Sequence, residues 1–165
     1  MKTINYSRHL TMKARLKTTL KTLQKMKIAR FFLIITLIAI LDQATKFFIR
    51  INNVNSIIIK NILSFTFLKN TGVSFGLLKG HNWIFTLISF IAIVLFSYMY
   101  VQEKNYTFQF SLILGGVAGN MIDRIYLGYV VDFVNFHIWP VFNIADSCVF
   151  IGTLWLVYLM WKEEK

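Results

Sequence analysis

The sequence has few of the residues that build disulfide frameworks, metal centres or disordered segments. It contains one cysteine, one proline, eight glycines and three histidines among 165 residues. The lone Cys148 excludes an internal disulfide framework, and so little proline and glycine excludes collagen-like and low-complexity classes. The histidines are dispersed, with no HExxH motif or cysteine pair beside them, so we predict no metal site and no cofactor. They are His9, His81 and His137.

Acidic residues are also scarce, and none precedes Asp42. The chain has 18 Lys and Arg against seven Asp and Glu, for a net charge of +11, and nine of the basic residues lie at or before Arg30. A basic tail beside apolar segments is typical of cytoplasmic placement, so we expect no nucleic-acid partner. Four apolar residues of the tail recur at helical spacing, which favours a helix lying on anionic lipid headgroups. They are Met12, Leu16, Leu20 and Leu23. The alternative is a solvated basic segment.

Long apolar segments make up most of the remaining chain, which is 56% hydrophobic overall. A helix that crosses the hydrocarbon core needs about 20 mostly apolar residues. Four segments fit, at about 28–49, 83–101, 108–122 and 141–161. We interpret the first as a retained helix rather than a cleaved signal peptide, because no small-x-small site follows it. We therefore predict a mainly α-helical membrane protein, with a basic leader over 1–27 and one four-span domain over 28–165.

The distribution of Lys and Arg orients these spans. The two termini and the connection between spans two and three carry twelve basic residues, and the two opposite segments carry five. The positive-inside rule then places both termini in the cytoplasm and residues 51–82 and 123–140 outside. β-Branched residues at 57–59 and polar–apolar alternation over 62–68 predict a small outer β-sheet within about 52–80. Asn70-Thr71-Gly72 predicts a turn there, and a short outer segment joins spans three and four.

Four of the seven carboxylates lie inside predicted spans or near their outer ends, where an ionisable side chain is costly and is a candidate for function. They are Asp42, Asp123, Asp132 and Asp146. Asp42 and Lys46 are spaced i,i+4, which predicts an ion pair within the membrane. Asp123 adjoins Arg124 at a helix end, which predicts an interfacial anchor. Asp132 and Asp146 have no adjacent cation, so they are the candidates for chemistry.

Two carboxyls that meet in a pocket of low dielectric share one proton. The ionised member can take a proton from water while the protonated member polarises a peptide carbonyl and later helps to protonate the leaving amine. Residues 72–76 match G-x-S-x-G, but the chain has no room for the α/β-hydrolase sheet, so Ser74 is not the predicted nucleophile. The alternatives are a transporter or proton relay with intramembrane carboxylates, and a scaffold assembled through the small-xxx-small pair of Gly115 and Gly119.

Four sequence blocks lie in order along these spans and outer segments. They are LDQATK at 41–46, NTGVSFG at 70–76, GNMIDR at 119–124, and VDF at 131–133 followed by WPVFNIADS at 139–147. Together they resemble the lipoprotein signal peptidase (signal peptidase II) family, and their order and spacing follow it from about Phe31 to Trp161. The resemblance implies an aspartic endopeptidase of the bacterial inner membrane with its site near the outer face. Such enzymes cleave prolipoproteins on the N-terminal side of a diacylglyceryl-modified cysteine.

The resemblance also assigns roles to residues. It implies that Asp132 and Asp146 are the catalytic pair and that the outer sheet is the family's β-cradle. The residues implied to line the site are Asn70, Gly72, Asn120, Arg124 and Asn143, and the polar residues taken as structural are Asp42, Lys46 and Asp123. We expect diacylglyceryl-modified prolipoproteins and membrane lipids as partners and a monomeric enzyme. The basic leader is longer than the family usually shows.

Overall fold

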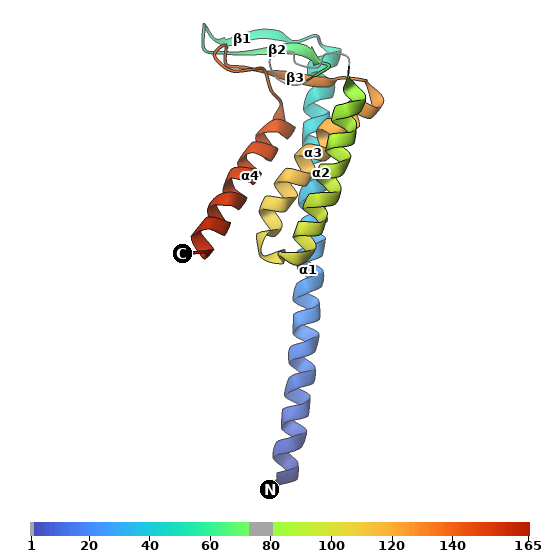
Figure 1. The fold of residues 1–165 in the computed structure, drawn as a ribbon, viewed down its shortest axis with the longest axis vertical. Helices are drawn as coiled ribbons and strands as arrows, with labels where there is room; N and C mark the ends of the chain where they lie inside the picture. Colours follow the sequence, from blue (N-terminus) through green and yellow to red (C-terminus); the bar gives the residue numbers. More distant parts are fainter. Residues whose placement is uncertain (1, 73–80) are drawn as a thin grey trace.

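The computed structural model describes residues 2–72 and 81–165, with side chains from Arg15 onward. Helices and a small sheet alternate along the chain. The elements are α1 (Lys2–Ile51), β1 (Asn55–Ile59), β2 (Leu63–Asn70), α2 (Asn82–Gln102), the 3-10 turn η2 (Lys104–Tyr106), α3 (Thr107–Tyr126), β3 (Val130–Asn135) and α4 (Ile144–Glu163). The sheet caps one end of the helices, and the C-terminus lies at the opposite end (Figure 1).

Three of these helices are long and apolar enough to cross a membrane: α1 from Arg15, α2 and α4. They match the predicted spans at 28–49, 83–101 and 141–161 closely, apart from the longer start of α1. The helix predicted at 108–122 is present as α3. It is not among the described helices that are long and apolar enough to cross a membrane. Its crossing of the membrane stays a prediction.

α3 packs against each of the other three helices and is the most buried of the four. Polar side chains such as Gln109, Ser111, Asn120 and Asp123 are buried, so α3 carries them inside the bundle. Close packing depends on glycine, because a Cβ on Gly119 would lie 2.5 Å from Oδ2 of Asp42. The glycine pair predicted to allow close helix approach therefore lies at real helix contacts.

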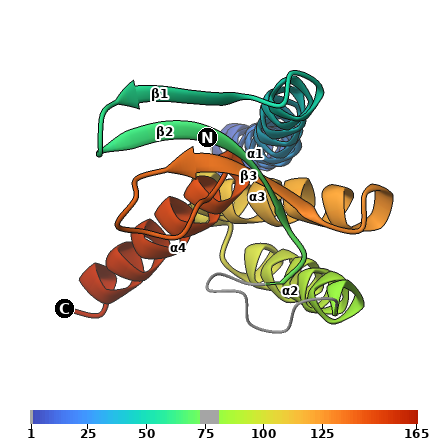
Figure 2. The same ribbon diagram turned by 90° about the horizontal axis from the view of Figure 1, so that it is seen from above.

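The sheet has three antiparallel strands in the order β1-β2-β3 (Figure 2). β1 and β2 fall within the predicted 52–80 segment, and β2 matches the alternating pattern. β3 was not predicted as a strand, because Val130, Val131, Phe133 and Val134 form an apolar run without alternation. In the structure β3 pairs with β2, and Leu68 lies opposite Asp132. This pairing carries one of the two candidate acids to the sheet.

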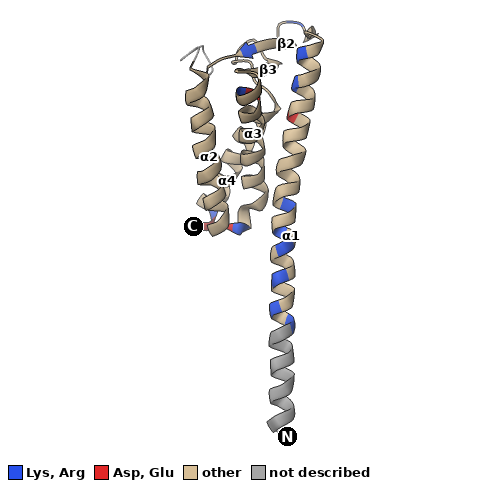
Figure 3. Ribbon diagram, turned by 90° about the vertical axis from the view of Figure 1, so that its right-hand side faces the viewer, with Lys and Arg blue, Asp and Glu red and all other residues tan. Residues whose placement is uncertain are grey.

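The basic leader is continuous with the first span, because α1 runs unbroken from Lys2 to Ile51. Residue 27 is therefore not the end of a secondary-structure element. Every described side chain from Arg15 to Arg30 is exposed, and burial begins at Phe31. Lys and Arg mark this exposed part of the helix, beyond the end of the bundle (Figure 3). Burial, and not helix formation, distinguishes the leader from the rest of the chain.

Two hydrophobic clusters stabilise the described part of the protein. One contains Phe31 with Tyr100 and Phe110, and the other contains Ile49 with Val131 and Phe133 beneath the sheet. Along α1, the polar residues Asp42, Gln43 and Lys46 lie between these clusters. The polar residues are thus enclosed on both sides by apolar packing, which keeps water away and strengthens their electrostatic interactions.

Candidate active site

Asp132 lies on β3 and is almost completely buried, at 1% exposure. Its two carboxyl oxygens accept hydrogen bonds from two different amides. Asn143 donates through Nδ2 to Oδ1 at 2.7 Å, and Asn70, at the end of β2, donates through Nδ2 to Oδ2 at 2.8 Å. The oxygen of the Asn70 side chain accepts from the backbone N–H of Gly72 at 3.0 Å, which forms the predicted turn. The turn therefore orients the amide that holds Asp132.

Asp146 lies in the first turn of α4, where the helix begins with a capping box. The Asn143 side chain accepts from the backbone N–H of Asp146 at 2.9 Å, and Asp146 Oδ2 accepts from the backbone N–H of Asn143 at 3.2 Å. Such reciprocal bonds satisfy N–H groups that have no partner at the start of a helix. The cap therefore has a second result: it fixes the Asp146 carboxyl beside the residue that also holds Asp132.

Asn120 on α3 completes the link between the two acids. Its Nδ2 donates to Oδ1 of Asp146 at 2.7 Å, and its Oδ1 accepts from Nδ2 of Asn143 at 3.1 Å. Asn120 is 8% exposed and Asn143 is 0% exposed. Because buried amides are restricted by their hydrogen bonds, these two side chains set the positions of both carboxyls.

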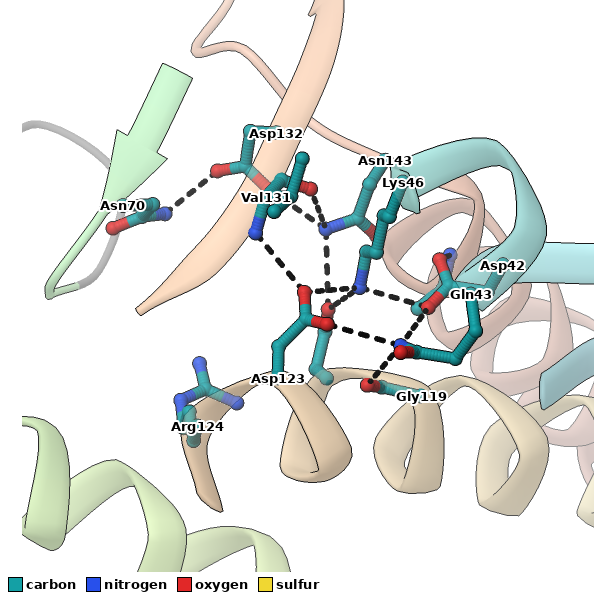
Figure 4. Close-up of polar contacts among 12 residues, drawn as sticks. Asp42, Gln43, Lys46, Asn70, Gly119, Asp123, Arg124, Val131, Asp132 and Asn143 are labelled. Carbon is teal, nitrogen blue, oxygen red and sulfur yellow. Dashed lines mark hydrogen bonds and ion pairs between the residues drawn. The ribbon is translucent and has the colours of Figure 1, made fainter. Parts of the chain in front are cut away.

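The predicted ion pair is present, and it is part of a larger buried cluster (Figure 4). Lys46 Nζ lies 2.8 Å from Oδ2 of Asp42 and 3.0 Å from Oδ2 of Asp123. Asp123 also accepts from the backbone N–H of Val131 at 3.0 Å. The expectation that Asp123 acts with Arg124 as an interfacial anchor is not what the structure shows, because Asp123 is 2% exposed and pairs with a lysine 77 positions earlier.

A cavity of about 590 Å³ opens where the sheet meets α3 and α4. Its lining includes both candidate acids together with Asn70, Gly72 and Arg124. Apolar residues from the β3–α4 connection and the start of α4 form most of the remaining wall. Asn120 and Asn143 hold the acids from behind this lining. The structure thus gathers all seven residues that the resemblance implied for the site.

Arg124 is the cation of this cavity. Its guanidinium donates to Oγ of Ser89 at 3.4 Å and lies 5.8 Å from the centre of the Phe85 ring, and both partners are on α2. No salt bridge joins it to an acid within the described part of the chain. Several N–H donors of the guanidinium therefore remain for a bound molecule, since an arginine carries five.

The acids of the cavity sit in an environment that favours a shared proton. Burial raises the pKa of Asp132 to about 7, and the negative charge of Asp146 adds to the rise. Hydrogen bonds from Asn70 and Asn143 and the positive charge of Lys46 oppose it. Near neutral pH, Asp132 can therefore hold a proton or release it, as a general acid requires.

Two residues of this region were missed from the sequence. Gln43 donates through Nε2 to Oδ1 of Asp123 at 3.0 Å and to the backbone oxygen of Gly119 at 3.1 Å, joining α1 to α3. Its place beside Asp42 in an apolar helix was the available signal. The second is Ser89, whose Oγ accepts from the guanidinium of Arg124. Ser74, the serine of the G-x-S-x-G match, lies outside the described residues.

Two carboxyls facing one cavity, one of them able to hold a proton at neutral pH, are suited to activating water against a carbonyl group. The amides around them offer fixed donors, and Arg124 offers a positive charge. Among the described residues no group of three His, Cys, Asp or Glu side chains is arranged to hold a metal ion.

Comparison with protein families gives a match over most of the chain. Residues 34–162 match the family described as signal peptidase (SPase) II. A protein named lipoprotein signal peptidase from Halothermothrix orenii is 38% identical over 140 residues, covering 81% of this chain and 97% of that protein. A protein of the same name from Clostridioides difficile is 39% identical over 145 residues, covering 82% of this chain and 97% of its own length.

Solved structures give a similar result. A bacterial membrane enzyme determined at 2.3 Å resolution superposes with a TM-score of 0.77 and 30% sequence identity, covering 84% of this chain and 91% of that one. A second, at 1.9 Å, gives a TM-score of 0.72 at 30% identity, covering 81% and 93%. Both fold and sequence therefore agree over the part of the chain that follows the basic leader.

Proposed function

This chain belongs to the signal peptidase II family, and from that premise we propose that it cleaves prolipoproteins on the N-terminal side of a diacylglyceryl-modified cysteine, with Asp132 and Asp146 as the catalytic pair. Membership of the family makes it a membrane peptidase that processes the signal peptides of prolipoproteins. The transporter and scaffold alternatives give way to this assignment.

One observation carries the proposal: both acids line the same cavity while Asn143 binds each of them. Asp132 comes from a strand and Asp146 from a helix, 14 positions later, yet one asparagine connects them. A pair of carboxyls fixed in this way can hold a water molecule between them. Such an arrangement needs neither a metal ion nor a covalent intermediate to hydrolyse a peptide bond.

The surroundings suggest which carboxyl begins the reaction with the proton. Asp132 is the more buried acid, and its pKa of about 7 keeps it protonated in a large share of the molecules at neutral pH. Asp146 lies at the start of α4, where the partial positive charge of the helix dipole stabilises a carboxylate. We therefore assign the proton to Asp132 and the negative charge to Asp146.

The reaction then follows in two steps. Asp146 removes a proton from water, the water oxygen bonds to the scissile carbonyl carbon, and Asp132 gives its proton to the carbonyl oxygen. In the resulting tetrahedral intermediate, Asp146 passes its proton to the amide nitrogen as the carbon–nitrogen bond breaks. Asp132 recovers a proton from one hydroxyl as the carboxylic acid product forms. The pair returns to its starting state, and the modified cysteine becomes the new N-terminus.

The proposed placement in the membrane makes α3 a fourth span at the centre of the bundle, with its polar residues covered by α1, α2 and α4. The positive-inside rule puts both termini in the cytoplasm, because twelve basic residues lie on that side against five on the other. The sheet and the catalytic pair then lie at the outer face of a bacterial inner membrane. The 50-residue α1 would extend the basic leader into the cytoplasm.

A second cavity supports a lipid-modified substrate. It measures about 440 Å³ and lies between α2, α3 and α4. Its walls are mainly apolar, and it shares Arg124, Asp146 and Phe150 with the cavity of the acids. We propose that apolar parts of the substrate enter along this cavity from the bilayer. The peptide beyond the cysteine would then lie beneath the sheet.

A cleavage assay with purified protein tests the proposal. Diacylglyceryl-modified and unmodified prolipoproteins are compared, and mass spectrometry identifies the new N-terminus. The expected result is cleavage of the modified substrate before its cysteine, with Asp132→Asn and Asp146→Asn each lowering kcat by roughly 10²–10⁴-fold or more.

The matched control is Glu163→Gln, which removes a carboxylate from the far end of α4. Glu163 accepts from Oη of Tyr106 at 2.6 Å and takes no part in the cavity. This variant should keep its turnover. Near-normal turnover by either aspartate variant, with a confirmed folded state, would refute the proposed pair.

A further inference from the structure

Lys46 has one interaction that an ion pair with Asp42 and Asp123 does not explain. Its ammonium group has three N–H donors, and the third is directed to Oδ1 of Asn120 at 2.8 Å. The lysine is 2% exposed, so water does not compete for these donors. Its position at the centre of the cluster is visible in Figure 4. One of its three N–H donors therefore binds a neutral side chain of the candidate site.

This contact determines which way the Asn120 amide faces. A lysine ammonium can only donate, so the oxygen of the amide must point toward Lys46. The NH₂ group consequently points the other way, where it donates to Oδ1 of Asp146 at 2.7 Å. With the amide reversed, the NH₂ group would face the ammonium and the oxygen would face the carboxylate. Both contacts would then be repulsive.

The ammonium also changes the strength of the next hydrogen bond. A positive charge on the oxygen side of an amide withdraws electron density and makes its N–H groups better donors, because hydrogen bonds in a chain polarise one another. Asn120 passes this effect to Asp146 directly. The oxygen of Asn120 also accepts from Asn143, which donates to Asp132. The lysine is therefore two hydrogen bonds away from one acid and connected to the other through Asn143.

We propose that Lys46 is a positioning residue of the peptidase, which orients Asn120 and thereby fixes the Asp146 carboxylate for its reaction with water. The inference rests on the proposed function, since it requires the Asp132 and Asp146 pair to be catalytic. Lys46 does not line the cavity of the acids, so its proposed role acts through Asn120. Its removal should lower kcat and leave KM unchanged.

The charged groups around the pair come from three helices. α1 contributes Asp42 and Lys46, α3 contributes Asp123 and Arg124, and α4 contributes Asp146 itself. The positive charge of Lys46 lowers the pKa of Asp132 against the larger effect of burial. Removing the charge of Lys46 therefore raises the pKa of Asp132 further.

The main test is the double variant Lys46→Met/Asp42→Asn. Loss of Lys46 alone leaves two buried carboxylates without their cation, which destabilises a protein whatever the role of the lysine. The double variant removes one positive and one negative charge, so it preserves the charge of the cluster while abolishing the donor to Asn120. We expect it to fold, to keep its KM and to lose kcat by roughly 10- to 100-fold. A purely structural lysine predicts wild-type kcat, and that result would overturn the inference.

Asp42→Asn alone provides a second test that does not depend on how the double variant folds. Lys46 and its bond to Asn120 remain in this variant, so kcat per folded molecule should be preserved at the optimum. If Asp42→Asn lost as much kcat as the double variant, the loss would come from disturbing the cluster and not from the missing bond between Lys46 and Asn120, and the inference would be overturned.

Failure of the proposed function gives a different pattern. If Asp132→Asn or Asp146→Asn retains turnover in the same assay, the catalytic pair is wrong and the role of Lys46 falls with it. If both aspartate variants are inactive while the double variant keeps wild-type kcat and its pH profile, only the positioning role is refuted.

Discussion

The side-chain amide of Asn143 donates to Oδ1 of Asp132 at 2.7 Å, and this bond ties the strand that carries one acid to the helix that carries the other. Asn143 is also the N-cap of α4, and its own backbone N–H donates to Asp146 at 3.2 Å. Asn143 therefore has two roles: its side chain caps α4, and it sets the relative position of the two carboxyls.

Asn143→Ala should lower both stability and activity. It removes the helix cap and the donors to Asp132 and Asn120, so we expect a loss of about 1–3 kcal/mol in the free energy of unfolding and of roughly 100-fold in kcat. Asn143→Ser keeps a good capping side chain but cannot reach Asp132, so it should recover most of the stability and little of the activity. Thermal melts in detergent and turnover rates measure the two effects. Equal recovery of both would contradict the double role.

The matched control is Asn135→Ala, at the end of β3. The Asn135 side chain accepts from the backbone N–H of His137 at 2.8 Å in an exposed turn, away from the cavity. Its loss should leave kcat close to that of the wild type.

Stability should depend on pH through Asp132. The pKa of this acid rises from 3.8 to about 7 on folding. Between about pH 4 and pH 7 the folded protein holds a proton that the unfolded chain has released, so the free energy of unfolding falls as pH rises through this range. Above about pH 7 the contribution levels off.

Melting curves of the wild type and of Asp132→Asn across this range test the pH dependence. The difference between the two should change steadily with pH and become constant above about pH 7. Parallel curves throughout would mean that Asp132 does not titrate in this range. Activity should decline over the same upper limb, because the reaction needs the protonated acid.

Gly119→Ala should separate α1 from α3. The added Cβ would lie 2.5 Å from Oδ2 of Asp42, whose side chain is held by Lys46 and by the backbone N–H of Ala145. Because these atoms have little freedom to move, we expect a cost of about 1–3 kcal/mol in stability.

Gly128→Ala serves as a comparison for that substitution. Gly128 has a φ of +78° and no atom within 4 Å of the added Cβ. Its cost should therefore be limited to backbone strain, of about 1–2 kcal/mol, with activity retained per folded molecule. If Gly119→Ala were as active and as stable as the wild type, the packing of α1 against α3 would be looser than the 2.5 Å approach indicates.

Removal of residues 2–26 should leave catalysis unchanged. The described side chains from Arg15 to Arg30 are exposed, and the family match begins at residue 34. We therefore expect the shortened protein to keep its kcat and its melting temperature in detergent, when both are compared with the full chain. A loss of either would assign the basic leader a structural part in the peptidase.

Hydrophobic periodicity and composition predicted the apolar helices of this protein. α2 was placed to within one residue at each end, because an uncharged apolar segment with polar flanks has clear limits. α1 was predicted too short, since hydropathy marks only the apolar part of a continuous helix. β3 was missed because a strand buried on both faces lacks alternation, and its pairing with β2 joins residues 60 or more positions apart.

Asp132 and Asp146 were identified as candidate catalytic acids because no Lys or Arg lies next to them in sequence. The same reasoning misplaced Asp123, since its nearest cation in sequence is Arg124 but its partner in space is Lys46. Pairs close in sequence follow from helix geometry, whereas pairs from separate helices depend on how those helices pack. Asn120 as the link between Lys46 and Asp146 belongs to the second kind.

The donors that hold the two acids come from β2, α3 and the start of α4. Asp132 can accept from Asn70 as soon as β2 and β3 pair, but Asn143 and Asp146 both arrive with the start of α4. Docking of α4 onto α3 would therefore be the step that completes the proposed catalytic pair. Before that contact forms, the bundle would hold one carboxyl where the proposed reaction needs two.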